Sequence, residues 1–435
     1  MEKTRTKPKP NILLKHEREK RGWSQNKLGE LIGADSTMVS RWERGERRPE
    51  PTYQEKLCHV FTKNAAELGF IESPQPILEQ DDINEAQTPP QTNVPPLAKM
   101  LTMQSEQLIE RYSDEKDKLL HLTIDGMNWI MPEVVLIDNT RSKLPITAIN
   151  VQIDSIHPEY HIPAKIASKA SDILEEVERY FYDSTTIRLN GMKIDNSSYT
   201  LIVSKAHFLQ YATTNYAMDI VLPHKGWSRS LRDIVHPGKH LCDLEDSLLA
   251  NHLGVNVLVF TLDNYLVIPL RASANIATWQ QKISPSISGA TSFDDDMWNF
   301  RAGPAASWIR EGREELGLSN SNFDDSKDIF LGLTRDLLRG GKPETFFATQ
   351  LNITKAEVER KIKKAKDKWE NKEIQWSEFT SPLTCPTTKK ERDTFLQEFL
   401  TLVRSYEERL SRPAQVNLAF WFKYIWYPIE NMASQ

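Results

Sequence analysis

Cysteine and long apolar runs are both scarce in this chain of 435 residues. Its three cysteines, Cys58, Cys242 and Cys385, are widely separated and follow no metal-binding or redox spacing, which suits a reducing compartment. The N-terminus has no apolar signal core, and no run approaches the roughly 18 apolar residues that span a bilayer. The sequence therefore predicts a cytoplasmic protein with no membrane partner.

Positive charge is not in excess over the whole chain, whose formal net charge is -5. That balance alone argues against a nucleic-acid partner. The first 65 residues differ, because they contain 15 Lys or Arg and 9 Asp or Glu, a local net charge of +6. A locally basic segment of this kind favours contact with the phosphates of a nucleic acid.

Residues 72–97 lack Lys and Arg altogether and are rich in proline, Gln, Asn and acidic residues. Such a composition cannot bury enough apolar surface to offset the entropy lost on ordering. We therefore expect a flexible tether here. The chain is also too long for one small core, so the tether separates at least two domains.

Signals for two short helices lie on either side of a tight turn at Gly33. Ser24 and Asp35 are good N-caps for the first and second helix, and Gly33 suits the left-handed C-cap of the first. Gly45 is placed to end the second helix. The spacing of these residues predicts a helical hairpin.

Each of these helices has one apolar face. Leu28 and Leu31 share a face of the first helix, and Met38, Val39 and Trp42 are spaced to meet a core from the second. Small polar and basic side chains are then left pointing outward from the second helix, in a position to hydrogen-bond base edges and phosphates. They are Ser36, Thr37, Ser40 and Arg41.

The hairpin resembles the Cro/C1 (XRE) type of helix-turn-helix domain. The likeness lies in Gln25 at the start of the first helix, the small Gly29, the run 39–45, and the prolines Pro49 and Pro51. It covers about residues 11–65 and implies an all-α DNA-binding domain of about five helices over residues 11–70. It also implies double-stranded DNA as a partner, with operator contacts from Gln25, Ser36, Thr37, Ser40, Arg41 and Arg44. The alternative is an amphipathic helical hairpin with no role at DNA.

Residues 98–239 read as an α+β region with no evident chemistry. Apolar residues at 101, 108, 112, 119 and 122 approximate a heptad seam, so this segment either forms a dimerising helix or packs on the following domain. A homodimer would place two helix-turn-helix units on two half-sites. Further along, the periodicity predicts strands at 149–153, 187–189, 199–204 and 218–222, a turn at 190–191, and helices at 164–182 and 244–253.

A second informative stretch, residues 310–318, reads as the end of a helix that Gly317 terminates. Glu311, Glu314 and Glu315 follow helical spacing, so their carboxylates gather on one face. Crowded carboxylates repel each other, and a hard cation such as Mg²⁺ or Mn²⁺ relieves that repulsion. The alternative is a charged surface helix with a glycine cap.

This stretch resembles the second half of the Nudix box, G-x5-E-x7-R-E-U-x-E-E-x-G-U, where U is apolar. The resemblance implies metal ligation by Glu311, Glu314 and Glu315, an orienting role for Arg310, and a further catalytic acid, for which Glu344 is the candidate. The first half of the box does not match, because Asp296 and Ala302 fall on its Gly and first Glu. Gly312 stands where the box has an apolar residue.

Strands predicted at 255–260, 265–270, 329–333 and 344–348 surround this helix in an order that suits a Nudix-like domain over residues 240–430. The expected fold is thus multidomain, an all-α helix-turn-helix domain tethered to a larger α+β region that includes a Nudix-like α/β/α sandwich. Nearby, Arg335 and Lys342 either bind phosphate or solvate a Gly340–Gly341 turn.

Three functions fit these patterns. The first is a transcriptional regulator whose Nudix-like domain senses a nucleotide or nucleoside-diphosphate metabolite. The second is a Mg²⁺-dependent pyrophosphohydrolase with an accessory DNA-binding domain, and the third is a module that binds another protein. The first is favoured, because the DNA-reading motif is complete while only half of the hydrolase box is present.

Overall fold

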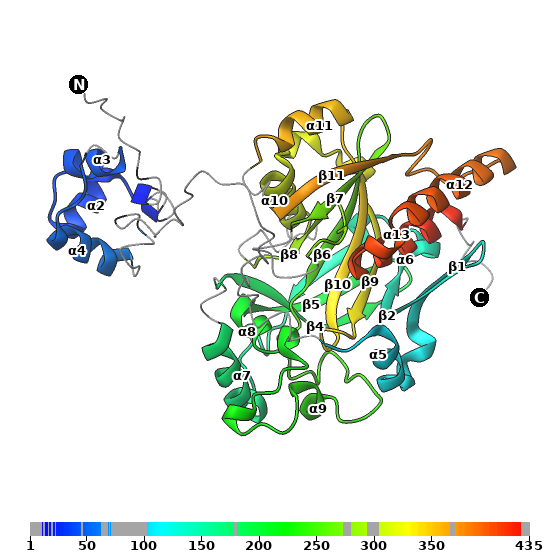
Figure 1. Cartoon of the computed structure of the whole chain (residues 1–435), viewed down its shortest axis with the longest axis horizontal. Coiled ribbons are helices and arrows are strands. Elements are labelled where there is room, and N and C mark those ends of the chain that lie inside the picture. Colours follow the sequence, from blue (N-terminus) through cyan, green and yellow to red (C-terminus); the bar gives the residue numbers. More distant parts are fainter. Residues whose placement is uncertain are drawn as a thin grey trace, which may run out of the picture. The chain divides into compact units, whose positions relative to one another are not determined.

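The structure is a computed structural model in which the chain divides into two compact units, Met1–Pro90 and Gln91–Gln435, each described here by itself (Figure 1). The residues that it describes are 11, 14–15, 17–18, 21, 23–44, 47–61, 68, 70, 102–177, 181, 183–272, 280–293, 304–365 and 370–427. The predicted tether 72–97 lies outside these ranges. In the part of the chain that is described, no helix is long and apolar enough to cross a bilayer.

The first unit contains the predicted hairpin as α2 (Gln25–Ile32) and α3 (Ser36–Glu43), followed by α4 (Pro51–Phe61). Both predicted N-caps are confirmed, since the Ser24 side chain accepts a hydrogen bond from the amide of Lys27 and Asp35 accepts one from the amide of Thr37. Gly33 has a φ of 70° and ends α2 in the left-handed region. The C-cap of α3 is Arg44, and Gly45 lies outside the described residues.

The core of this unit forms where α2, α3 and α4 meet, around Leu28, Val39 and Trp42. The prediction that Leu31 faces the core with Leu28 was wrong, because Leu31 is 43% exposed and Ile32 is buried instead. Both residues lie close to the Leu28 face at helical spacing, and the packing of α4 selects the one at i+4. Gly29 permits the close approach of the turn, since a Cβ there would lie 2.5 Å from the Ala34 carbonyl oxygen.

A buried ion pair fastens α3 to the residues that precede α2. The Arg18 guanidinium contacts both carboxylate oxygens of Glu43, through Nε at 2.6 Å and Nη2 at 3.0 Å. Arg18 also donates to the Trp23 carbonyl, and the Gln25 side chain donates to Glu43 Oε2 at 2.8 Å. Both side chains are nearly inaccessible to solvent. Burial of either charge without the other would be strongly unfavourable.

The second unit is built on a mixed sheet in the order β1-β2-β9-β10-β6-β7-β11, with β8 paired to β6. Neighbouring strands are antiparallel except β10 and β6, which are parallel. The strands are β1 (Leu119–Ile124), β2 (Met127–Asp138), β6 (Gly254–Phe260), β7 (Tyr265–Arg271), β8 (Ile287–Ala290), β9 (Ile329–Asp336), β10 (Lys342–Gln350) and β11 (Asn371–Glu378).

Helices cover both faces of this sheet (Figure 1). On β6, Leu258 and Phe260 face one core, with α12 (Lys389–Tyr406) and α13 (Arg412–Trp426), while Val257 and Val259 face the other, with α10 (Pro304–Leu316) and α11 (Lys355–Ile362). A strand buried on both faces is apolar at successive positions, which is why residues 257–260 are four apolar residues in a row. Helix–sheet–helix layering occurs in many folds, so it does not by itself identify a Nudix-like one.

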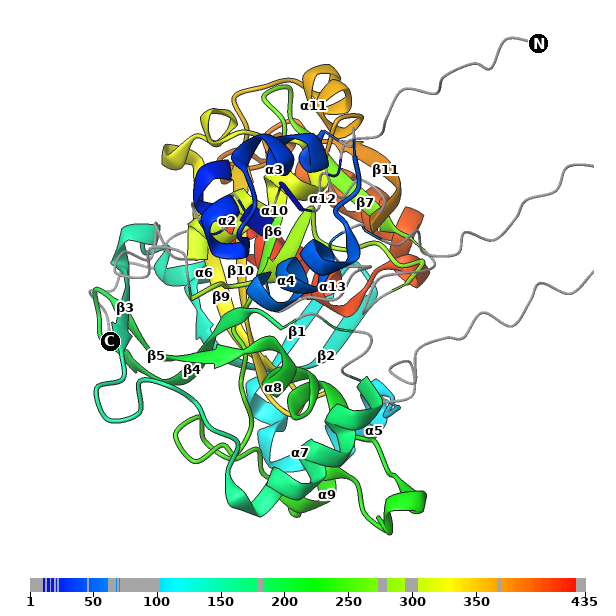
Figure 2. The same ribbon diagram turned by 90° about the vertical axis from the view of Figure 1, so that its left-hand side faces the viewer.

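A smaller sheet, β3-β5-β4, packs on the core that contains Val257 and Val259. The helices α7 (Ala164–Val177) and α8 (Phe208–Ala212) lie near this sheet (Figure 2). Its strands are β3 (Ile149–Ile153), β4 (Thr185–Ile194) and β5 (Tyr199–His207). The predicted boundary near residue 240 falls inside one compact unit, because β2 is hydrogen-bonded to β9.

Three local predictions in this region were wrong. The turn at 190–191 is a register shift inside β4, and 218–222 follows a 3₁₀ turn instead of forming a strand. The segment 244–253 is irregular rather than helical, because the Arg188 guanidinium takes the carbonyls of Ser247 and Leu249 as acceptors. Those carbonyls are the groups that a helix would use for its own hydrogen bonds.

The heptad seam at 101–122 is not one continuous helix. The segment contains α5 (Ser105–Arg111), a 3₁₀ turn (Ser113–Lys118) and the start of β1. Leu108 and Tyr112 are fully buried against Val134 and Leu241 of the same unit. Packing on the following domain was therefore the correct alternative for this segment.

We predict that Glu43→Ala lowers the free energy of local opening of α2 and α3 by about 3–5 kcal/mol, because it leaves Arg18 buried without its partner. Native-state hydrogen exchange of the α2 and α3 amides measures this in the full chain. The matched control is Glu50→Ala, whose pair with Arg47 is exposed on both sides and contributes about 0–1 kcal/mol. Equal effects of the two substitutions would contradict a structural role for the Arg18–Glu43 pair.

Candidate functional site

The outward face of α3 presents the predicted DNA-reading residues. Thr37, Arg41 and Arg44 are exposed, and Ser36 and Ser40 are partly exposed. All five lie opposite the buried Val39 and Trp42, so the apolar face fixes which side chains point to solvent. The arrangement presents hydroxyl and guanidinium groups on a short, capped helix, which suits insertion into a major groove.

Gln25 lies at the first position of α2 and is partly exposed. The Gln25 amide nitrogen donates to Glu43, and this hydrogen bond orients the Gln25 side chain. Hydrogen bonds from Thr37, together with the nearby Arg41 charge, lower the pKa of Asp35, the N-cap of α3. Asp35 therefore stays ionised as the cap at neutral pH, and the start of α3 is held in place.

The predicted acidic helix is α10, and it ends at Gly317, whose φ is 69°. Arg310 Nη1 lies 2.9 Å from a carboxylate oxygen of Glu311 and 3.4 Å from one of Glu314. Glu315 is 4% exposed in its side chain and lies 3.9 Å from Arg271. The three carboxylates thus each lie beside an arginine, two of them beside the same one.

Burial raises the pKa of Glu311 to about 7, an effect that Arg310 opposes and Glu314 reinforces. Its carboxylate packs against β8, where a Cβ on Gly289 would lie 2.4 Å from Glu311 Oε1. Glu311 is thus enclosed between α10 and β8, and this burial is the main cause of its raised pKa.

Glu344, the candidate catalytic acid, belongs to a different cluster. It lies on β10, where Glu344 Oε1 accepts from Arg339 and Lys342 at 2.6 Å each, and Oε2 accepts from Asn256 at 3.0 Å. Arg339 also donates to Asp336 at 2.6 Å. All of these groups are buried, so Glu344 acts as the shared anion of a buried charge network.

The predicted metal role finds no support in this geometry. Among the described residues, no three or more His, Cys, Asp or Glu side chains form a group that could hold a metal ion. Residues 294–303, which contain Asp296 and Ala302, lie outside the described ranges. As arranged, Glu311, Glu314 and Glu315 do not fit Mg²⁺ or Mn²⁺.

A cavity of about 200 Å³ opens beside the Glu344 cluster. Aromatic side chains from α8 and the following turn form one side, and cationic side chains from β7 and from the hairpin between β9 and β10 form another. The sequence prediction missed this cavity, since its residues come from distant segments with no common spacing. Only Lys342 and Glu344 had been singled out.

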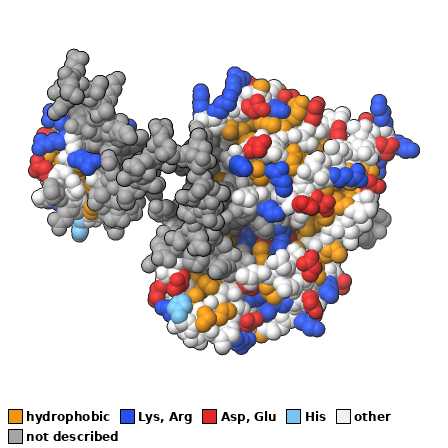
Figure 3. Space-filling view, viewed as in Figure 1, with side chains coloured by type: hydrophobic (Ala, Val, Ile, Leu, Met, Phe, Trp, Pro, Cys, Tyr) orange, Lys and Arg blue, Asp and Glu red, His pale blue; other side chains and the backbone are white. Residues whose placement is uncertain are grey.

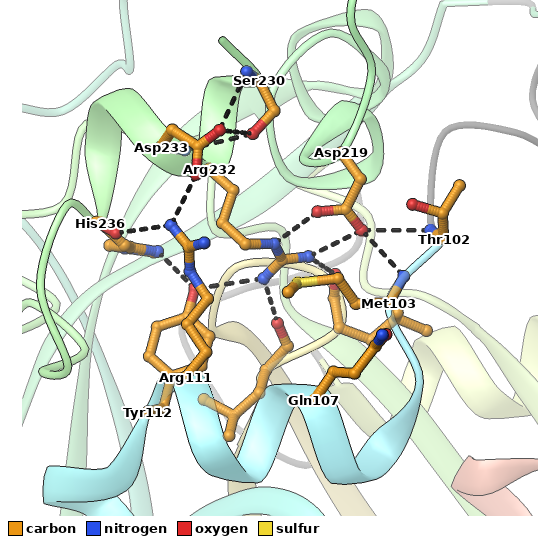
Figure 4. Close-up of polar contacts among 12 residues, drawn as sticks. Thr102, Met103, Gln107, Arg111, Tyr112, Asp219, Ser230, Arg232, Asp233 and His236 are labelled. Atoms are coloured by element: carbon orange, nitrogen blue, oxygen red, sulfur yellow. Dashed lines mark hydrogen bonds and ion pairs between the residues drawn. The ribbon is translucent and has the colours of Figure 1, made fainter.

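Another buried network connects the beginning of the second unit to the same hairpin (Figure 4). The Asp219 carboxylate accepts from the amides of Thr102 and Met103 and pairs with Arg232. Arg232 Nη1 in turn donates to the Leu337 carbonyl at 2.7 Å and to the Tyr112 hydroxyl at 3.1 Å. The first described residues after the tether are therefore fixed to the turn that leads into β10.

Comparison with known proteins supports the first unit's assignment. Residues 14–68 match a helix-turn-helix family model, which supports a DNA-binding transcription regulator. No curated protein matches the chain. Among solved structures, the chain is similar to the crystal structure of DR0079 from Deinococcus radiodurans, with 14% identity over 39% of this chain and 80% of that chain. The TM-score is 0.22, too low to carry an inference about fold or function.

We predict that Glu311→Gln removes a pH-dependent loss of stability. The pKa of Glu311 is about 7 in the folded protein and 4.5 in an ordinary glutamate, so wild-type stability falls as pH rises between these values. The loss approaches about 1.4 kcal/mol per pH unit across that window. Chemical denaturation of both proteins over this range measures it. Parallel pH profiles would mean that Glu311 is already ionised in the folded protein at the lower pH.

Proposed function

We propose that the chain is a one-component transcriptional regulator that reads an operator with its helix-turn-helix unit and senses a nucleotide-type metabolite with its C-terminal unit. The observation that carries the DNA-reading part is the solvent-facing hydroxyl and guanidinium surface of α3, described above. The match of residues 14–68 to a helix-turn-helix family model also supports DNA reading.

Each residue on that surface has a chemical role in the proposal. Arg41 has the planar donors that recognise the O6 and N7 acceptors of guanine, and Gln25 can pair with adenine. The hydroxyls of Ser36, Thr37 and Ser40 bond base edges or phosphates, and Arg44 adds a phosphate contact. In a homodimer, two copies of α3 would enter successive major grooves about 34 Å apart.

The sensing part is supported by the connection between the tether end and the β9–β10 hairpin. Asp219 and Arg232 bind Thr102 and Met103 to the hairpin, and Arg339 and Lys342 of that hairpin line the cavity. A ligand that repositions the hairpin would change the contacts that hold the first residues of this unit. That is the physical requirement for a ligand to influence an attached DNA-binding domain.

A Mg²⁺-dependent pyrophosphohydrolase is the alternative, and α10 is its only support. Arg310 pairs with Glu311 and Glu314, Glu315 lies 3.9 Å from Arg271 instead, and burial raises the pKa of Glu311 to about 7. The alternative therefore requires a rearrangement of α10 before a cation could bind. Mg²⁺-dependent release of monophosphate that disappears in Glu314→Gln would favour it over the sensor.

The operator-reading proposal is tested with the full chain on duplexes selected from random DNA. We expect the double substitution Ser40→Ala with Arg41→Ala to weaken binding to the selected duplex about 30-fold or more, since two lost base contacts at about 1–3 kcal/mol each total at least about 2 kcal/mol. Binding to random duplex should weaken much less. Fluorescence anisotropy at matched salt concentrations measures both affinities.

Arg404→Ala is the matched control, because it removes one positive charge from an exposed site on the C-terminal unit. We expect it to leave both affinities within about twofold of wild type, because Arg404 belongs to the other compact unit and is not part of the α3 surface. Base reading by α3 would be contradicted by an equal loss on selected and random DNA.

A further inference from the structure

The cavity beside the β9–β10 hairpin has one aromatic wall. Phe208, Tyr211 and Tyr216 line it, with ring centroids 5.6 Å apart for Phe208 and Tyr211 and 5.9 Å apart for Tyr211 and Tyr216. The His252 ring continues this wall at 4.9 Å from Tyr211. Contiguous aromatic faces of this kind stack against planar ligands and tolerate different ring types.

A second wall is cationic. Arg271, Arg339 and Lys342 line the cavity, and Glu344 is the one anionic side chain among the described residues that line it. Three other carboxylates pair with these cations without lining it: Asp336 with Arg339, and Glu370 and Glu315 with Arg271. The surface facing the cavity therefore carries more positive than negative charge, and an anionic group placed there would be attracted.

Two buried polar atoms of the lining residues have no hydrogen-bond partner in the described protein. They are His252 Nδ1 and Arg271 Nε. His252 is 3% exposed, and burial, together with the charges of Lys342 and Arg339, holds its pKa well below the usual value, so its ring is neutral. A buried polar atom left without a partner is unfavourable, and a ligand that supplies the missing bond removes that cost.

The size of the cavity limits what can enter. A closed apolar cavity of about 150 Å³ holds one benzene ring, so about 200 Å³ accommodates the ring system of a larger ligand. Because the cavity is open to solvent and not enclosed, the rest of such a ligand can extend through the opening. Most sites for drug-sized ligands are larger, at about 300–1,000 Å³. The ring of the ligand would fill the aromatic side, and its polar part would lie toward the cationic wall.

We propose that this cavity is a binding site for a planar heteroaromatic ligand that carries one phosphate, the chemistry of a nucleoside monophosphate. The base stacks on Phe208 and Tyr211, and a polar edge of the base bonds to His252 Nδ1. The phosphate lies near Lys342 and Arg271. This inference rests on the proposed sensing function and names its site. The site borders the carboxylates of α10, because Arg271 lies 3.9 Å from Glu315 and the cavity-lining Gly289 packs against Glu311.

Lys342 gives the site a pH dependence. Burial lowers the pKa of Lys342 to about 8, an effect that Glu344 opposes. A phosphate beside the ammonium group favours its charged form, so binding is expected to weaken as pH rises through this value. His252, which is already neutral, does not contribute to that change.

The test uses the full-length protein without DNA and measures binding by isothermal titration calorimetry. The probes are AMP, GMP, CMP and UMP, the four corresponding nucleosides, and inorganic phosphate. We expect at least one monophosphate to bind, and to bind more tightly than its nucleoside by tenfold or more. Its affinity should fall as pH is raised above about 8, where Lys342 loses its proton.

Three substitutions separate the parts of the site. His252→Phe keeps a ring in the aromatic wall and removes the unpartnered nitrogen, so it should weaken binding tenfold or more while leaving the melting temperature of the free protein unchanged or higher. Lys342→Met should weaken binding of the monophosphate and not of the nucleoside. Phe208→Ala should weaken binding of both.

His236→Phe is the matched control, because His236 is also buried but its Nδ1 lies 3.0 Å from the Tyr112 hydroxyl, outside the cavity. It should lower the melting temperature of the free protein and leave ligand affinity within twofold. The proposal is overturned if no probe binds, or if binding survives both His252→Phe and Phe208→Ala. Operator binding is measured separately, so a failure of this site leaves the DNA-reading proposal intact, and the reverse.

Discussion

Pairing of buried charges at the β9–β10 hairpin is the constraint on which the C-terminal unit depends. Asp336, Arg339, Lys342 and Glu344 are each less than 9% exposed, and ionised groups are tolerated at such depth only when each has a partner. The partners come from several elements. Arg412 at the start of α13 lies 3.6 Å from Asp336, and Asn256 on β6 bonds to Glu344.

The same constraint determines the local electrostatics of the neighbouring strand. Burial, together with the negative charge of Asp336, raises the pKa of Glu133 on β2 well above its usual value. Glu133 accepts a hydrogen bond from the Thr334 hydroxyl, which partly opposes this rise. Gly340 and Gly341, both with positive φ, let the hairpin turn sharply enough to bring its charges together. The hairpin thereby joins the main sheet, the cavity and the tether end.

Basic and acidic side chains are interspersed elsewhere on the visible face of this unit (Figure 3).

Local signals account for what the sequence predicted correctly. Ser24, Gly33 and Asp35 cap helices through contacts within a few residues, and Gly317 ends α10 in the same way. The apolar run of β6 identifies a strand buried on both faces. Predictions failed where contacts with a distant residue determined the local structure. In the segment 244–253, for example, Arg188 donates hydrogen bonds to the carbonyls of Ser247 and Leu249. The cavity could not be predicted because Tyr211, His252 and Arg271 meet only in the folded chain.

In the function we propose, one chain couples ligand binding in its C-terminal unit to operator reading by α3. The most direct measurement is the dissociation constant of the full chain for its selected operator, with and without a saturating nucleoside monophosphate that binds the cavity. We predict a change of about 5- to 150-fold, the range of typical coupling between two sites. Equal operator affinity of the free and the ligand-bound protein would contradict the claim.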